Sequence, residues 1–149
     1  MIPSSSATEL IRQLELQPHP EGGWYRETWR APAPDGARAS ATCIYFLLEE
    51  GQRSHWHKVD ASEIWLWHAG SPVVLSTSLT DTGPVMDIML GGDILAGETP
   101  QHLIEPDCWQ SAHASAGWAL VSCIVSPGFE FDGFELAPPG WSPHPSDDR

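Results

Sequence analysis

Hydrophobic and polar positions change their spacing along the chain, and the first spacing is helical. Leu10 and Leu14 belong to an apolar stripe with the period of an amphipathic helix. Ser6 and Glu9 have the spacing of a capping box, with Ser6 as the N-cap. Pro18 cannot continue a helix. The pattern therefore predicts one short helix at the N-terminus.

From residue 42 onward the pattern is that of β-strands. Short segments rich in β-branched and aromatic residues are separated by turn residues such as Gly, Pro and Asp. These segments are 42–48, 64–67, 73–79, 86–90, 102–104 and 119–125, followed by a bent strand over 129–134. No second helical pattern follows. We therefore predict an all-β fold, an antiparallel sandwich or barrel with one short N-terminal helix.

The length of the chain, 149 residues, fits a single domain. We expect one domain over residues 1–149, folded over about 7–137, with a loose tail rich in Pro, Ser and Asp at 138–149. Eight tryptophans are spread along the whole chain. They favour an aromatic-walled interior or an aromatic interface.

The charge balance is strongly acidic and narrows the classes of partner. Seven Lys and Arg residues against twenty Asp and Glu residues give a net charge of −13, which repels nucleic acids and anionic membranes. The three cysteines form no CxxC pair, so zinc-finger and disulfide-scaffold folds are excluded. The sequence shows no signal-peptide pattern and no apolar run of membrane-spanning length. We expect a cytoplasmic protein that binds neither nucleic acid nor membrane.

One short segment combines residues that can hold a metal ion. His55 and His57 are two positions apart, so on a strand both imidazoles point to the same face. Glu63 follows after a predicted turn, which would bring its carboxylate beside the two histidines. Two histidines and one carboxylate can hold a divalent ion and leave positions open for substrate. The alternative is that all three are solvated polar residues on an exposed strand face.

The same segment resembles the first sequence motif of the cupins. That motif has a Gly, then His-x-His, then Glu, then six residues and a second Gly, here Gly51, His55, His57, Glu63 and Gly70. The gap from Glu63 to Gly70 matches the cupin pattern, and the two earlier gaps differ slightly. In the region that resembles the second cupin motif, residues 104–110, Gln110 stands where the cupins have a fourth, histidine ligand. Glutamine can ligate through its carbonyl oxygen, but more weakly than imidazole.

Further segments narrow the resemblance to one small cupin family. Residues 18–27, 63–65, 90–91, 97–101 and 126–131 together resemble the fifth cupin domain family, which is catalogued as a domain of unknown function. The resemblance runs from about Ile11 to Leu136. It implies a jelly-roll β-barrel that is often a homodimer, and it implies no known reaction.

Several other residues are candidates for the same pocket. The polar block His19, Glu21, Arg26 and Glu27 forms either a pocket rim or a set of ion pairs that fixes the N-terminal segment. The candidate catalytic residues are His57, Tyr25 and Arg26, and the candidate pocket residues are Arg26, Glu27, Tyr45, Trp65 and Gln101.

The function expected from these residues is small-molecule chemistry. The leading hypothesis is an isomerase, epimerase or lyase acting on a sugar-like or acid substrate. In it a divalent ion, Mn, Fe, Ni or Zn, is held by His55, His57 and Glu63, with Gln110. The alternatives are a metal-free acid–base epimerase, with His57 or His55 as the base and a tyrosine as the acid, and a non-catalytic ligand-binding barrel.

Overall fold

The computed structural model describes residues 5–145 of the chain. Its elements are α1 (Ser5–Gln13), β1 (Gln17–Pro18), β2 (Trp24–Arg30), β3 (Thr42–Leu48), β4 (Arg53–Val59), β5 (Ser62–Gly70), β6 (Val73–Ser78), β7 (Met86–Leu90), η1 (Ile94–Ala96), β8 (Gln101–Ile104), β9 (Trp109–His113), β10 (Ala119–Ser126), η2 (Phe131–Gly133) and β11 (Phe134–Leu136). Within this part of the chain no helix is long and apolar enough to cross a membrane.

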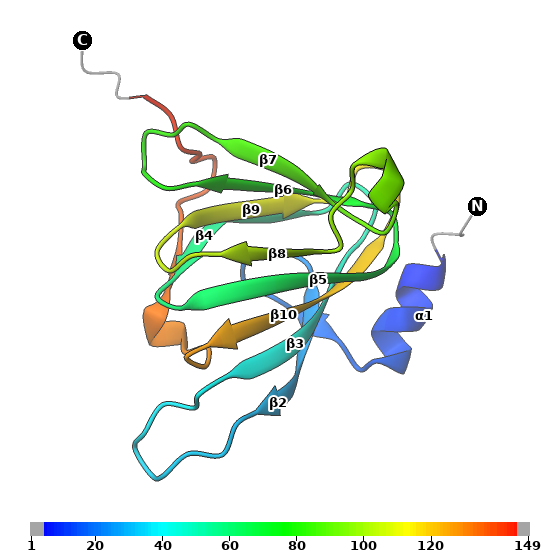
Figure 1. Ribbon diagram of the computed structural model, residues 1–149. Helices are drawn as coiled ribbons and strands as arrows, with labels where there is room; N and C mark the ends of the chain where they lie inside the picture. Colours follow the sequence, from blue (N-terminus) through cyan, green and yellow to red (C-terminus); the bar gives the residue numbers. More distant parts are fainter. Residues whose placement is uncertain (1–4, 146–149) are drawn as a thin grey trace.

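The strands form two antiparallel sheets that make the walls of a barrel. One sheet has the order β1-β2-β3-β10-β5-β8, and the other has the order β11-β4-β9-β6-β7. Figure 1 shows β6, β7 and β9 of the second sheet above the strands of the first. Side chains of both sheets form the main hydrophobic core. Several strand neighbours are far apart in sequence, such as β3 and β10 or β4 and β9, which is the jelly-roll arrangement. The predicted all-β barrel with one short helix is confirmed.

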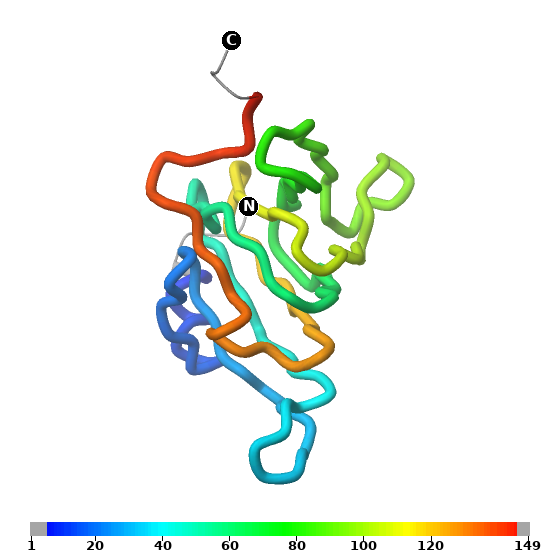
Figure 2. The backbone as a smooth tube through the Cα atoms, turned by 90° about the vertical axis from the view of Figure 1, so that its left-hand side faces the viewer, coloured from blue at the N-terminus to red at the C-terminus, as the bar shows by residue number. Residues whose placement is uncertain are grey.

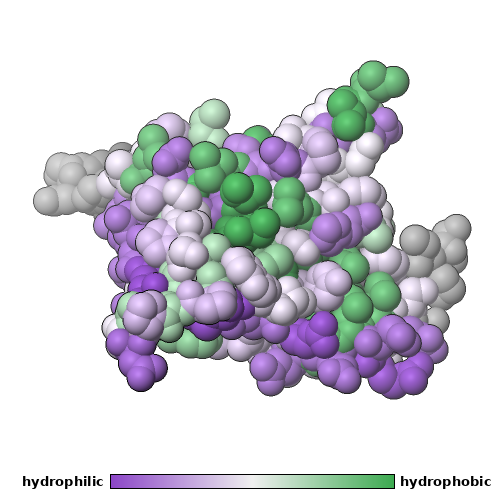
Figure 3. All heavy atoms as spheres, turned by 60° about the horizontal axis from the view of Figure 1, so that its bottom comes forward, coloured by the Kyte–Doolittle hydropathy of each residue, from purple (hydrophilic) through white to green (hydrophobic). Residues whose placement is uncertain are grey.

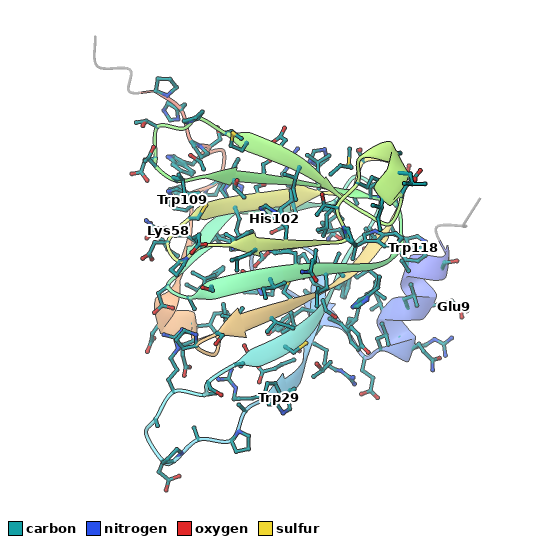
Figure 4. All side chains as sticks on the ribbon, viewed as in Figure 1. Glu9, Trp29, Lys58, His102, Trp109 and Trp118 are labelled. Carbon is teal, nitrogen blue, oxygen red and sulfur yellow. The ribbon has the colours of Figure 1, made fainter. Side chains whose placement is uncertain are left out.

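Helix α1 covers one end of the six-stranded sheet. Its apolar side chains pack on Leu47 and Trp118, and Figure 4 shows Trp118 at the end of the sheet that faces the helix. The predicted N-cap is wrong, because the helix already includes Ser5 and an N-cap residue lies outside the helix. At the other end the helix stops at Gln13, before Pro18. Glu15, two residues after the helix, adopts a positive φ of 57°, which is typical of a residue that ends a helix.

Two strands that shape the site are absent from the sequence prediction. Strand β9 contains the polar residues Gln110 and Ser111, yet both are buried, so its polar composition hides a fully buried strand. Strand β2 is mostly polar or exposed and lacks a clear apolar alternation. The predicted bent strand over 129–134 is only partly right, because Phe131 begins the 3₁₀ turn η2 and the strand β11 starts at Phe134.

The C-terminal segment remains in contact with the barrel after the last strand. Strand β11 pairs with β4, and the Trp141 ring then lies 4.6 Å from the Trp109 ring, measured between centroids. The Lys58 ammonium group also lies 4.8 Å from the centre of the Trp109 ring, and Figure 4 shows these two residues together at one end of the barrel. Figure 2 shows the segment in orange and red crossing the side of the barrel. Residues 146–149 of the predicted tail lie outside the described residues.

Some apolar surface remains uncovered. Leu103 on the edge strand β8 is 49% exposed, and Met86 on the edge strand β7 is 64% exposed. Apolar side chains also gather near the middle of the lower face of the molecule (Figure 3). Unpaired edges and apolar patches are the surfaces through which a homodimer would form, and the dimer stays a prediction.

Candidate functional site

A cavity of about 180 Å³ opens between the two sheets. It lies beside β2, β3, β4, β5 and β10, and the segment that follows β10 closes one side. Its polar floor consists of His19, Glu21, His57 and Glu63. These four side chains are buried or half-buried, so their protonation states depend on their contacts rather than on water.

Glu21 reaches the floor because of the turn that precedes β2. The Gly22 N–H donates to the carbonyl of His19, and the Glu21 carbonyl accepts from the backbone N–H of His55 on β4. Gly22 has a φ of 104°, and a Cβ at this position would overlap the carbonyl oxygen of Arg53. Only glycine therefore allows this loop to approach β4 closely.

The carboxyl group of Glu21 is buried and lies among three polar side chains. The Ser54 hydroxyl donates to Oε2, while Oε1 lies 3.5 Å from His57 Nε2 and 3.4 Å from His19 Nδ1. Burial raises the pKa of Glu21 from 4.5 to about 8, against the opposing effect of the Ser54 hydrogen bond. Glu21 is consequently a protonated carboxylic acid at neutral pH.

His57 is held in one tautomer, with its free nitrogen toward the cavity floor. Nδ1 lies 2.8 Å from the carbonyl oxygen of His55, and a carbonyl only accepts, so Nδ1 carries the hydrogen. Nε2 then presents its lone pair toward Glu21. Burial lowers the pKa of His57, although the nearby Glu63 carboxylate acts in the opposite direction. His57 is therefore a neutral, oriented base.

Glu63 is positioned by a hydrogen-bonded chain that runs through Gln110. Trp65 Nε1 donates to Gln110 Oε1 at 2.9 Å, and Gln110 Nε2 donates to Glu63 Oε1 at 2.9 Å. Because the indole N–H can only donate, it fixes which end of the Gln110 amide faces Glu63. Burial raises the pKa of Glu63, and the neighbouring Glu21 adds to the rise. Trp65 and Gln110 thus support the floor from behind.

His19 adds a second neutral imidazole. Its Nδ1 accepts the backbone N–H of Glu21 at 3.1 Å, and its ring lies edge-on to Tyr25 at 4.5 Å between centroids. Burial and the neighbouring His57 lower the pKa of His19 to about 4. The tyrosine and histidine rings together form the part of the wall next to Glu21.

Strand β2 brings only some of the predicted pocket residues to the cavity. Tyr25 and Glu27 face inward and line it, as predicted. Arg26, between them, points to the outer face, where its guanidinium lies 3.5 Å from Glu15 and 6.0 Å from the centre of the Tyr45 ring. Arg26 and Tyr45 are register partners on adjacent strands and share that outer face. The structure therefore corrects the expectation that Arg26 and Tyr45 act in the pocket.

His55 does not join His57 at the cavity. The pairing of β4 with β9 shifts register between Ser54 and His57, so strict alternation fails there and Ser54 and His57 both contact Glu21. The His55 ring instead bonds through Nε2 to the carbonyl oxygen of Pro138 at 2.9 Å. A β-bulge is the physical reason for this correction.

Gln101 also lies away from the cavity. It is exposed on β8 and pairs with Leu66 of β5, whereas the neighbouring β5 residue Trp65 points into the core. Successive residues of a strand face opposite sides, so Leu66 and Gln101 lie on the outer face. The expected place of Gln101 in the pocket is therefore corrected, because its side chain lies on the outer face of the sheet.

The residues expected to hold a metal ion do not fit one. Only His57 and Glu63 of the four expected ligands line the cavity. The His55 nitrogen is bonded to Pro138, and the only oxygen of the Gln110 side chain accepts from Trp65. Across residues 5–145 no three His, Cys, Asp or Glu side chains are arranged to hold a metal ion. The predicted four-ligand set is therefore not assembled.

Sequence reasoning gave Glu21 too small a role and overlooked Ser54. In the sequence Glu21 was one of four residues of a polar block, for which a pocket rim and a set of ion pairs were equally possible roles. Its hydrogen-bond partner Ser54 lies 33 residues further along the chain, so no local pattern connects the two. The Gly22-Gly23 pair after Glu21 is the one local signal, because it marks a loop that can approach another backbone closely.

Comparison with known proteins places this chain in a family. The family model described as "Cupin superfamily (DUF985)" matches residues 8–137. The chain belongs to this cupin family. The resemblance seen in the sequence is thereby confirmed over nearly the whole folded region. No protein with a curated description matches the chain.

Solved structures support the same conclusion. A protein from Shewanella oneidensis is 41% identical, with a TM-score of 0.82 over 88% of this chain and 84% of that one. A hypothetical protein from Leishmania major is 33% identical, with a TM-score of 0.79 over 88% and 86% of the two chains. Oxalate decarboxylase from Bacillus subtilis has a TM-score of 0.61 at 13% identity, over 80% of this cupin and 29% of the decarboxylase, which shows a shared fold alone.

Proposed function

We propose that this cupin binds a small molecule and catalyses a proton transfer of the isomerase or epimerase type, with His57 as the base and Glu21 as the acid. One observation carries the proposal. At the cavity floor His57 Nε2, which carries a lone pair, lies 3.5 Å from Oε1 of the protonated carboxyl group of Glu21. A neutral base beside a neutral acid is the combination that acid–base catalysis requires near pH 7.

The chemical step follows from these protonation states. His57 Nε2 accepts a proton from a carbon next to a carbonyl group, and the C–H electron pair forms a C=C bond. The carbonyl oxygen takes the proton of Glu21 and becomes an enol. In the second half the proton on His57 returns to carbon and an enol O–H proton returns to Glu21, so both residues regain their starting states. Return to the opposite face of the same carbon, after the planar enol has turned over, gives the epimer. In an α-hydroxy carbonyl compound, return to the former carbonyl carbon, with loss of the neighbouring hydroxyl proton to Glu21, gives the isomer. The proton count is unchanged, so no co-reactant is needed.

Tyr25 is a second candidate for the acid. It lines the cavity beside His19, within the same wall as Glu21. Glu21 is preferred because it contacts His57 directly and its pKa of about 8 lies close to neutral pH. Proton transfer is in turn preferred to the metal-dependent reaction, because only two of the four expected ligands face the cavity. A ligand-binding barrel without turnover remains the competing function.

Hydrogen–deuterium exchange tests the proposal without knowledge of the natural substrate. The protein is incubated in D₂O with small ketones and lactones, from hydroxyacetone to cyclohexanone, and loss of the signal of the proton next to the carbonyl is followed by ¹H NMR. We expect exchange that persists after treatment with EDTA. The His57→Gln variant should lose on the order of 10²–10⁴-fold in rate.

His55→Gln is the matched control, because His55 is on the same strand but bonds to Pro138 outside the cavity. It should exchange at the wild-type rate. Exchange abolished by EDTA, restored by a divalent ion and lost in both histidine variants would establish the metal-dependent reaction instead. Binding of a test compound, seen as a thermal shift, without any exchange would establish a binding barrel.

A further inference from the structure

The size of the cavity restricts what can enter it. A dry cavity of roughly 150 Å³ holds one benzene molecule. The volume here, about 180 Å³, leaves room for a single ring with one small substituent. A nucleotide or a disaccharide cannot be enclosed in this volume.

The walls above the polar floor are apolar. Ile44 and Val59 belong to β3 and β4, Val125 belongs to β10, and Phe129 and Phe131 follow it. The rings of Phe129 and Phe131 meet edge to face at 4.9 Å between centroids. Apolar walls of this kind favour the hydrocarbon face of a ring over an extended polar chain.

At the mouth of the cavity, among the described residues that line it, carboxylates outnumber cationic side chains, and the one cationic side chain is paired with a carboxylate. Among the described residues that line the cavity, Arg30 is the only arginine or lysine. Its guanidinium donates to both oxygens of Glu27 at 2.9 Å and to the carbonyl of Phe129 at 3.0 Å. Glu130 adds a second carboxylate to the lining and acts on Arg30 electrostatically. An anionic ligand would therefore be repelled by these carboxylates, and Arg30 could not offset the repulsion because its charge is already paired with Glu27.

The geometry points to a cavity that selects its ligand by charge, accepting an uncharged or cationic monocyclic molecule and rejecting carboxylates and phosphates. This inference rests on the proposed function, because it concerns the ligand of the same site. It narrows the substrate range expected from the sequence, which included acids. Glu27 and Arg30 form the selecting pair, and Glu130 reinforces it.

Three probes of nearly equal shape test the charge preference. Benzyl alcohol, benzylamine and benzoate share one ring and differ in charge at neutral pH, and their dissociation constants can be measured by titration calorimetry. We expect benzyl alcohol and benzylamine to bind at least roughly tenfold more tightly than benzoate, since like charges repel in a partly desolvated mouth.

The Glu27→Gln variant removes one carboxylate and releases Arg30 from its bidentate partner. Benzoate should then gain roughly tenfold in affinity and benzylamine should lose affinity. Glu50→Gln, which changes an exposed glutamate that does not line the cavity, should alter neither value. Equal binding of all three probes, no response to Glu27→Gln, or no binding of any probe would each overturn the inference.

His57→Gln separates this inference from the proposed reaction. Its ring lies at the floor rather than the mouth, so the order of the three affinities should persist while deuterium exchange is lost. Charge preference without exchange in the wild type would leave the selection intact and refute the catalytic proposal. Deuterium exchange without a charge preference would support the catalytic proposal and refute the charge selection.

Discussion

Glu21 connects the proposed chemistry to a property that requires no substrate, the pH dependence of folding stability. Burial raises its pKa from 4.5 to about 8 in the folded protein. The substitution Glu21→Gln keeps the shape of the side chain and an oxygen that accepts from Ser54, but removes the ionisation. The variant therefore isolates the cost of ionising this one buried group.

The sign follows from the proton balance of the folded and unfolded states. Between pH 4.5 and about 8 the unfolded chain releases the Glu21 proton while the folded protein retains it. The unfolded state binds fewer protons, so the free energy of unfolding falls as the pH rises. From pH 6.5 to pH 8 the loss is about 1.6 kcal/mol, because the slope starts at about 1.36 kcal/mol for each pH unit and falls to half of that at the folded-state pKa.

The range from pH 6.5 to pH 8 is chosen because the ionisation of His19 changes the folding stability mainly below it. The pKa of His19 is lowered from 6.5 to about 4, so its effect raises stability between pH 4 and pH 6.5 and is constant above. Glu63, whose pKa is also raised, contributes in the same direction as Glu21. Because Glu21 adds to the rise of the Glu63 pKa, Glu21→Gln removes the contribution of Glu21 together with that part of the Glu63 contribution.

Urea unfolding followed by tryptophan fluorescence, at pH 6.5, 7.0, 7.5 and 8.0, measures the effect. The wild type should lose at least about 1.6 kcal/mol across this range, the contribution of Glu21 alone, and Glu21→Gln should lose less than the wild type by about that amount or more. Glu50→Gln, at an exposed site, should follow the wild type. If Glu21→Gln and the wild type lose stability in parallel, Glu21 ionises normally in the folded protein and the acid role assigned to it is wrong.

Two further predictions concern the loop and the assembly. Gly22→Ala should destabilise the protein by about 1–3 kcal/mol more than Gly36→Ala, as judged by urea unfolding. Both glycines have positive φ, but only a Cβ at Gly22 meets the backbone of Arg53. Equal losses would show that the loop does not need its close approach to β4. Size-exclusion chromatography with light scattering at micromolar concentration should give twice the chain mass of 16.3 kDa. A monomer mass would contradict the expected homodimer.

The sequence predicted the barrel well because most strands are marked locally. The segments 42–48 and 86–90 coincide with β3 and β7, since β-branched and apolar residues between turn residues determine a strand from nearby positions alone. His57 and Glu63, which the cupin motif singled out, both line the cavity. Strand β9 escaped this reasoning, because its buried polar residues resemble a loop until their partners are known.

The alternation of residues along the chain therefore indicated the fold class, and the resemblance to the cupin motifs indicated the family and two members of the cavity floor. The tertiary structure alone decided which of the remaining polar residues meet there. A bulge in β4 turns His55 away, and a glycine loop carries Glu21 against Ser54, 33 residues further along. Both outcomes depend on the pairing of distant strands, which local spacing does not encode. For that reason the sequence indicated a four-ligand metal site, whereas in the folded chain His57 and Glu63 share the cavity floor with Glu21 and His19.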